Sequence, residues 1–121
     1  MTTYQEWFMM MLDEVSARMA ENLNITEEEV RQVVLDCEDK EIPPDLNALA
    51  HEDGVHPLKL AASACLLASW YNFIKTGRKL LKYKEEEDPD RYERQFDNMS
   101  EQDQAKALLA MRAAEEIDAI N

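Results

Sequence analysis

The spacing of the apolar residues restricts the secondary structure that this chain can form. Between residues 3 and 23 the large apolar side chains recur at steps of three and four residues, from Tyr4 and Trp7 to Met19 and Leu23. This spacing gathers side chains on one side of an α-helix, whereas a half-buried β-strand requires strict alternation. No segment of the sequence alternates in that way. The sequence therefore predicts an all-α fold.

Three long segments define the expected architecture. Residues 3–22, 57–76 and 101–120 each span 20 residues, so each would form a helix about 30 Å long. Shorter helices are expected after Thr26, as one or two turns within residues 42–56, and around Tyr92 and Phe96. We predict a compact bundle of five or six helices, three of about 20 residues, arranged around the apolar helix that begins at residue 57. A chain of 121 residues fits one domain, so a single helical domain over residues 1–121 is expected.

Two local signals bear on where helices begin and end. Thr26 is followed three residues later by Glu29, and Ile25 lies opposite Val30, which is the pattern of a capping box with a hydrophobic staple. Gly77 is suited to a left-handed helix end. However, residues 78–87 also have a helical pattern, so one continuous helix over residues 57–87 is the alternative.

The charge of the chain limits its partners. Twenty-six acidic and 13 basic residues give a formal net charge of −13, which opposes direct binding to nucleic acid or to an anionic membrane. The N-terminus lacks the basic start and apolar centre of a secretory signal, and two cysteines without such a signal are typical of reduced thiols. We therefore expect a cytoplasmic protein that binds basic protein surfaces.

Residues 58–74 are the most apolar stretch of the chain. Their length of 17 residues is at the lower limit for a membrane span, and they include Lys59 and Asn72. A buried helix covered by the other helices explains this stretch better, so we expect no membrane partner.

The charges are segregated along the chain. Residues 1–56 contain 14 acids and 3 bases, residues 57–84 contain 6 bases and no acid, and residues 85–121 contain 12 acids and 4 bases. The bases at the end of the middle segment are Lys75, Arg78, Lys79, Lys82 and Lys84. They are expected either to be neutralised by acids of the flanking helices or by Glu86, or to form a basic docking patch.

Ten carboxylates within 27 residues form the candidate binding face. They are Glu27, Glu28, Glu29, Asp36, Glu38, Asp39, Glu41, Asp45, Glu52 and Asp53. A small helical body with this density of carboxylates would compete for a groove that normally binds nucleic acid. In size and charge the chain is similar to nucleic-acid mimics that inhibit nucleases and other defence enzymes, and a viral or mobile-element origin fits its size. The alternative is that the acidity serves only solubility.

A metal site is the weakest of the chemical candidates. The residue types of zinc ligands occur between residues 37 and 65, at Cys37, His51, His56 and Cys65, with Glu52 and Asp53 as alternative oxygen ligands. Their spacing contains no Cys-x-x-Cys or His-x3-His clamp. Gly54 and Gly77 are the only glycines, which excludes a glycine-rich phosphate-binding loop.

These features predict a non-catalytic acidic module without a cofactor. It would act as an inhibitor or regulator that docks on the basic, nucleic-acid-binding surface of a partner enzyme. The first alternative is a structural or adaptor subunit of a homo- or hetero-oligomer, which would use the adjacent methionines Met9, Met10 and Met11 and the basic segment for contacts. The second alternative is a small metal-binding protein.

Overall fold

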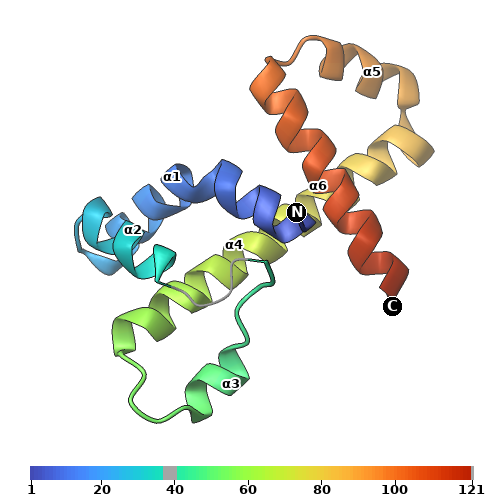
Figure 1. Cartoon of the computed structure of the whole chain (residues 1–121). Coiled ribbons are helices and arrows are strands. Elements are labelled where there is room, and N and C mark those ends of the chain that lie inside the picture. The colour runs from blue at the N-terminus through green and yellow to red at the C-terminus, as the bar shows by residue number, and fades with distance from the viewer. Residues whose placement is uncertain (37–40, 121) are drawn as a thin grey trace. The chain divides into compact units, whose positions relative to one another are not determined.

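The computed structural model describes residues 1–36 and 41–120. These residues form six α-helices and one π-helical turn, with no strand among them (Figure 1). The helices are α1 (Thr3–Leu23), α2 (Glu27–Leu35), α3 (Leu46–His51), α4 (Pro57–Lys82), α5 (Pro89–Asp97) and α6 (Glu101–Ile120), and the π-helical turn is η1 (Tyr83–Glu87). The all-α prediction is confirmed, and the three long helices are α1, α4 and α6.

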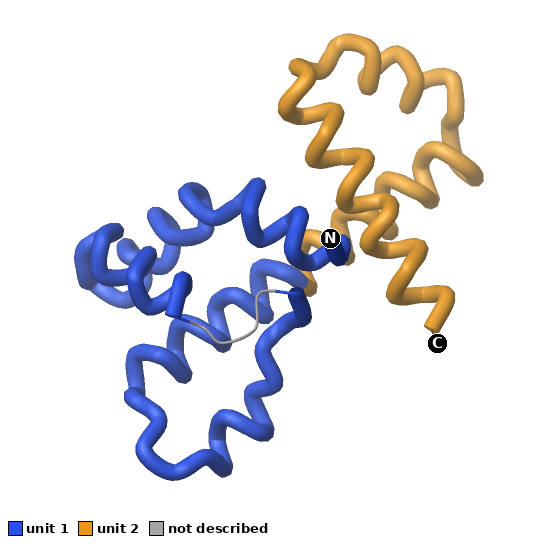
Figure 2. The backbone as a smooth tube through the Cα atoms, viewed as in Figure 1, with its two compact units in different colours: residues 1–70 blue, residues 71–121 orange. Residues whose placement is uncertain are grey.

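The chain divides into two compact units (Figure 2). Unit 1 comprises Met1–Trp70 and unit 2 comprises Tyr71–Asn121. Helix α4 contributes its first half to unit 1 and its second half to unit 2. The single domain over residues 1–121 stays a prediction.

Large aromatic rings form the core of unit 1. Tyr4 and Trp7 of α1 lie with their ring centroids 5.2 Å and 5.3 Å from Trp70 of α4. Only 1% of Trp7 is exposed, and Val15 and Met19 continue the buried stripe along α1. The three- and four-residue spacing therefore predicted the buried side of α1 correctly, because it is the side on which these rings meet α4.

Local features of the sequence fix where α1 ends and where α2 begins. Thr26 accepts a hydrogen bond from the Glu29 backbone N–H at 3.2 Å, and Glu29 accepts one from the Thr26 backbone N–H at 3.2 Å. This confirms the predicted capping box. Asn24 adopts a left-handed conformation with φ 55° and ends α1. Three residues separate the end of α1 at Leu23 from the start of α2 at Glu27, so the connection is short.

Unit 2 depends on a close approach of α4 to α6. A Cβ atom built on Gly77 would lie 1.9 Å from the carbonyl oxygen of Ala110. The facing side of α6 buries the small side chains of Ala107, Ala110 and Ala114. Gly77 does not end a helix, since it lies within α4. The absence of a side chain at Gly77 leaves room for the backbone of α6. Of the two alternatives, the structure shows the continuous one, with η1 extending α4 to Glu87.

A second aromatic cluster joins η1, α5 and α6. The ring centroids of Tyr83 and Phe96 lie 6.4 Å and 5.9 Å from that of Tyr92. The Tyr92 hydroxyl donates to Sδ of Met111 at 3.5 Å, and burial raises the pKa of this tyrosine. The short helix predicted around Tyr92 and Phe96 is confirmed, with Asp88 as its N-cap.

Helix α4 is buried along one stripe and open on another side. Ala62, Leu66 and Ile74 are buried, whereas Ala68 is exposed and Tyr71 is 59% exposed. The expectation that the other helices cover α4 on nearly every side therefore holds for only part of its surface. Over the described ranges, no helix combines the length and the apolar character that crossing a membrane requires.

Candidate protein-binding surfaces

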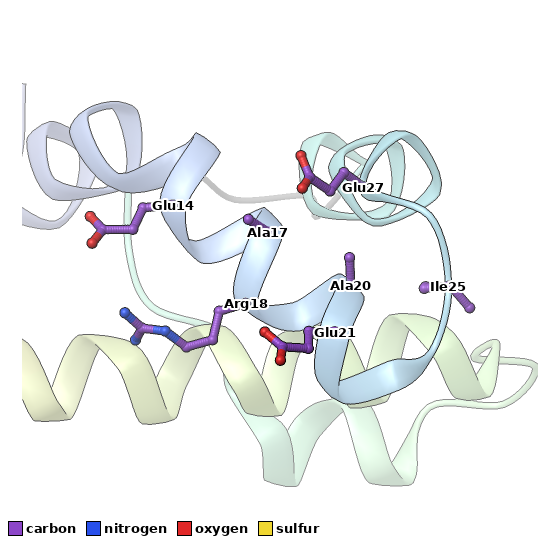
Figure 3. A pocket seen from close by; sticks show the side chains of 7 residues that line it. All are labelled: Glu14, Ala17, Arg18, Ala20, Glu21, Ile25 and Glu27. Carbon is purple, nitrogen blue, oxygen red and sulfur yellow. The ribbon is translucent and has the colours of Figure 1, made fainter.

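An open hollow lies between the second half of α1 and the start of α2 in unit 1 (Figure 3). Three glutamates, one arginine, two alanines and one isoleucine line it. The lining residues are Glu14, Ala17, Arg18, Ala20, Glu21, Ile25 and Glu27. The charged side chains of the lining carry a formal charge of −2, so the hollow suits a cation.

The helical spacing of α1 explains why these side chains meet. Glu14, Arg18 and Glu21 are separated by four and three residues, so they lie on one face of the helix. The short connection after Asn24 brings α2 back to pack against α1. The acidic face predicted from the sequence covers residues 27–53 only and does not include Glu14 and Glu21. Their spacing of seven residues was the signal that could have identified them.

Three of the ten predicted carboxylates have a local structural role. Glu29 belongs to the capping box of α2. Asp45 caps α3 by accepting from the Ala48 backbone N–H at 3.1 Å, and Asp36 accepts from the Gln32 side chain at 3.1 Å. These acids are explained by the local hydrogen bonds that they make.

Four other predicted carboxylates are exposed and have no hydrogen bond or ion pair within the part of the chain that the structure describes. They are Glu27, Glu28, Glu52 and Asp53. The backbone carbonyl of Glu41 accepts a hydrogen bond from the Thr2 hydroxyl at 2.5 Å. Two predicted acids, Glu38 and Asp39, lie outside the described residues. Glu27 also lines the hollow, so it joins the predicted acidic face to the acids of α1.

Three of the five predicted basic residues have partners within unit 2. Arg78 forms a two-point hydrogen bond with Asp118, with Nη2 2.7 Å from Oδ1 and Nε 3.2 Å from Oδ2. This hydrogen bond holds the pKa of Asp118 below its ordinary value. The Lys84 ammonium lies 5.7 Å from the centre of the Tyr92 ring, which is within the range of a cation–π interaction.

Lys82 pairs with an acid one position later than expected. Its Nζ lies 3.8 Å from Oε1 of Glu87, whereas the sequence suggested Glu86. The reason is η1, because a π-helical turn brings together residues five positions apart instead of four. Internal neutralisation therefore accounts for Arg78 and Lys82. Lys75 and Lys79 are exposed and make no ion pair with any described residue.

The candidate metal ligands do not form a site in the described part of the chain. His51 Nδ1 donates to the Asn47 carbonyl at 2.8 Å, and His56 Nδ1 accepts from the Leu58 backbone N–H at 3.1 Å. Cys65 is half-buried in α4, and Cys37 lies outside the described residues. Residues 1–36 and 41–120 contain no group of three or more His, Cys, Asp or Glu side chains arranged to hold a metal ion.

The methionine-rich segment of α1 is only partly available for contact. Met9 is 62% exposed, whereas Met10 and Met11 are half-buried. Met11 lies beside Trp7 and Leu66 at the packed side of the helix. Of the three consecutive methionines, Met9 alone presents most of its surface to solvent.

No family model, curated protein or solved structure matches this chain. Function is therefore inferred from the charges and from the geometry of the two units.

Proposed function

We propose that the protein is a non-catalytic interaction module that binds a basic surface of another protein and thereby inhibits or regulates it. The binding residues are the exposed acids at the hollow and at the start of α2. We call this set the acidic surface; it consists of Glu14, Glu21, Glu27 and Glu28. The preferred partner is an enzyme whose nucleic-acid-binding groove presents lysines and arginines.

The uneven distribution of charge between the units is the observation that carries this proposal. Unit 1 contains 14 acidic and 4 basic residues, whereas unit 2 contains 12 acidic and 9 basic residues. Acidic residues that serve only solubility need not be concentrated in one unit. A surface that attracts a cationic partner needs a local excess of acids over bases, since neighbouring bases would cancel its field.

The lining of the hollow also suits a lysine or arginine side chain. The alkyl stem of such a side chain would contact Ala17, Ala20 and Ile25, and its charged end would lie beside Glu21 and Glu27. This combination of apolar and acidic groups recognises a basic side chain better than it recognises a small hydrated cation.

The test uses a synthetic peptide of about twelve alternating lysines and arginines as the basic probe. The variant Glu27→Gln/Glu28→Gln removes two charges from the first turn of α2. Its matched control, Glu101→Gln/Asp103→Asn, removes two charges from the first turn of α6 in unit 2. Both variants lose first-turn acids, so both weaken the favourable interaction with the helix dipole in the same way.

We expect the α2 variant to bind the peptide about tenfold more weakly and the α6 variant to bind within about twofold of wild type. Wild-type affinity should fall steeply as the salt concentration rises. Fluorescence anisotropy of the labelled peptide measures both effects. Equal losses in the two variants would contradict the proposal, because they would show that only the total charge matters.

A further inference from the structure

In unit 2, one exposed face of helix α4 carries a tyrosine followed by a row of basic residues. Tyr71, Lys75, Arg78 and Lys82 follow one another at steps of four, three and four residues, which places them on one face of the helix. Lys79 lies at the edge of this face. We call these five residues the basic ridge. They are all exposed, and Tyr71 is 59% exposed.

Two of the four bases of this ridge have no ion-pair partner among the described residues. Lys75 and Lys79 make no ion pair within residues 1–36 and 41–120, whereas Arg78 and Lys82 pair with Asp118 and Glu87. Tyrosine is enriched at protein interfaces, because its ring offers a large rigid contact area and its hydroxyl can still form a hydrogen bond. The ridge therefore combines unpaired cations with an aromatic contact, which suits an acidic protein surface.

We propose that the basic ridge of one copy of this protein binds the acidic surface of a second copy. Charge complementarity selects this occupant, because residues 57–84 contain six bases and no acid, and the acidic surface contains four glutamates. The inference rests on the proposed function, since it uses the same acidic surface and identifies a second copy as one source of the basic partner.

The two contacting surfaces are different, so the contact is heterologous. Each copy carries one surface of each kind, and complexes would close as reciprocal dimers or rings or would grow as chains. A variant that has lost one surface still keeps the other. Two variants that lack different surfaces should therefore form one contact when they are mixed, although each of them associates only weakly by itself.

Self-association should also have an unusual dependence on salt. Each copy carries a net charge of −13, and at about 0.01 M salt the Debye length of about 30 Å allows whole molecules to repel one another. At about 0.15 M the Debye length is about 8 Å, so that repulsion is screened while ion pairs in contact persist. Still higher salt weakens the contact itself. Association should therefore be strongest at intermediate salt, in contrast to binding of a basic peptide, which strengthens continuously as salt falls.

Sedimentation velocity of the full chain tests the proposal. The ridge variant is Lys75→Glu/Lys79→Glu, and the acidic variant is Glu27→Gln/Glu28→Gln. Arg91→Glu/Arg94→Glu is the control, because it makes the same charge change at exposed residues of α5. Circular dichroism verifies that each variant has the helical content of wild type.

We expect wild type to associate at about 0.15 M salt and less at about 0.01 M, and the ridge and acidic variants to associate about tenfold more weakly. An equal mixture of these two variants should regain a complex that stops at two copies. The α5 control should lose clearly less than the ridge variant. A monomeric wild type at every salt concentration, or a mixture that stays monomeric, would overturn the inference.

The peptide experiment separates this inference from the proposed function. If wild type stays monomeric but binds the lysine–arginine peptide through Glu27 and Glu28, self-association is wrong and the proposed function stands. If the acidic variant loses neither peptide binding nor association, both are wrong.

Discussion

The two units differ in how they use their charges. Unit 1 has a formal charge of −10, and within it Arg31 forms an ion pair with Asp13. Unit 2 has a formal charge of −3 and uses bases of α4 to hold acids that follow them in the chain, as Arg78 holds Asp118. A total of −13 thus combines a strongly acidic unit with a nearly balanced one. The comparison shows that the balance within each unit is more informative than the total.

The units also differ in how their helices pack. Unit 1 buries large rings, with Trp7 and Trp70 in contact across α1 and α4. Unit 2 brings α4 and α6 together at Gly77 and Ala110, where no side chain separates the backbones. Unit 1 should therefore be most sensitive to the loss of volume, and unit 2 to its addition.

Truncation of Trp70 should produce the largest loss of stability. Trp70→Ala removes a buried ring that contacts Tyr4 and Trp7, so we expect the free energy of unfolding to fall by about 4 kcal/mol. Urea denaturation followed by circular dichroism measures this change. Tyr71→Ala, at the exposed neighbouring position, is the control and should cost less than about 1 kcal/mol. Similar losses in the two variants would contradict this expectation, because they would show that ring burial does not stabilise unit 1.

Addition of one methyl group should damage unit 2. Gly77→Ala would place its Cβ atom within 1.9 Å of the Ala110 carbonyl oxygen, so α4 and α6 must separate, at a cost of about 3 kcal/mol. Gly54→Ala is the control in unit 1, because Gly54 has φ +79° but open space around it. It should cost about 1 kcal/mol from backbone strain alone. If thermal unfolding shows equal losses, the close contact of α4 with α6 does not limit unit 2.

Removal of the capping box should have a moderate effect. Thr26→Ala deletes the side-chain acceptor of the Glu29 backbone N–H, and we expect a loss of about 1 kcal/mol. Hydrogen exchange should show the faster opening in α2 and little change in α6. Equally faster exchange in α2 and α6 would contradict the expectation that the loss of this cap affects unit 1 alone.

The smallest expected effect is on the stability of unit 2 at acid pH. The bond from Arg78 lowers the pKa of Asp118 in the folded chain, so the stability that it contributes is present above the ordinary aspartate pKa of about 3.9 and is lost as the pH falls through the lowered value. Arg78→Gln should return the pKa of Asp118 toward its ordinary value and remove this dependence. Carbon-detected NMR titration of the Asp118 carboxyl group measures the shift. Lys82→Gln, which breaks the neighbouring pair, should leave it unchanged, and a shift of equal size there would refute the assignment.

Local signals in the sequence predicted much of the fold. The capping box at Thr26 and Glu29, the short helix with Tyr92 and Phe96, and the buried stripe of α1 all depend on residues within a few positions of one another. Gly77 was ambiguous, because the residue that explains it, Ala110, lies 33 positions later. Sequence spacing alone does not show which backbone approaches a glycine.

The candidate surfaces were harder to predict than the helices. The sequence identified Glu27 and Glu28, but Glu14 and Glu21 join them only because the short connection after Asn24 folds α2 against α1. From the sequence, the basic residues could be either neutralised within the chain or available to a partner. For Arg78 the answer depends on Asp118, which lies 40 positions later in the chain. Contacts between distant parts of the chain therefore decide which charges remain for a partner.

Mapping the bound basic peptide on the chain tests whether the acidic surface of unit 1 is the binding site. Two-dimensional NMR of the labelled protein, titrated with the lysine–arginine peptide, reports which backbone amides change their environment. We expect the largest shifts in α1 from Glu14 onward and at the start of α2, with small shifts in α5 and α6. Shifts of equal size in both units, or shifts concentrated in unit 2, would contradict it.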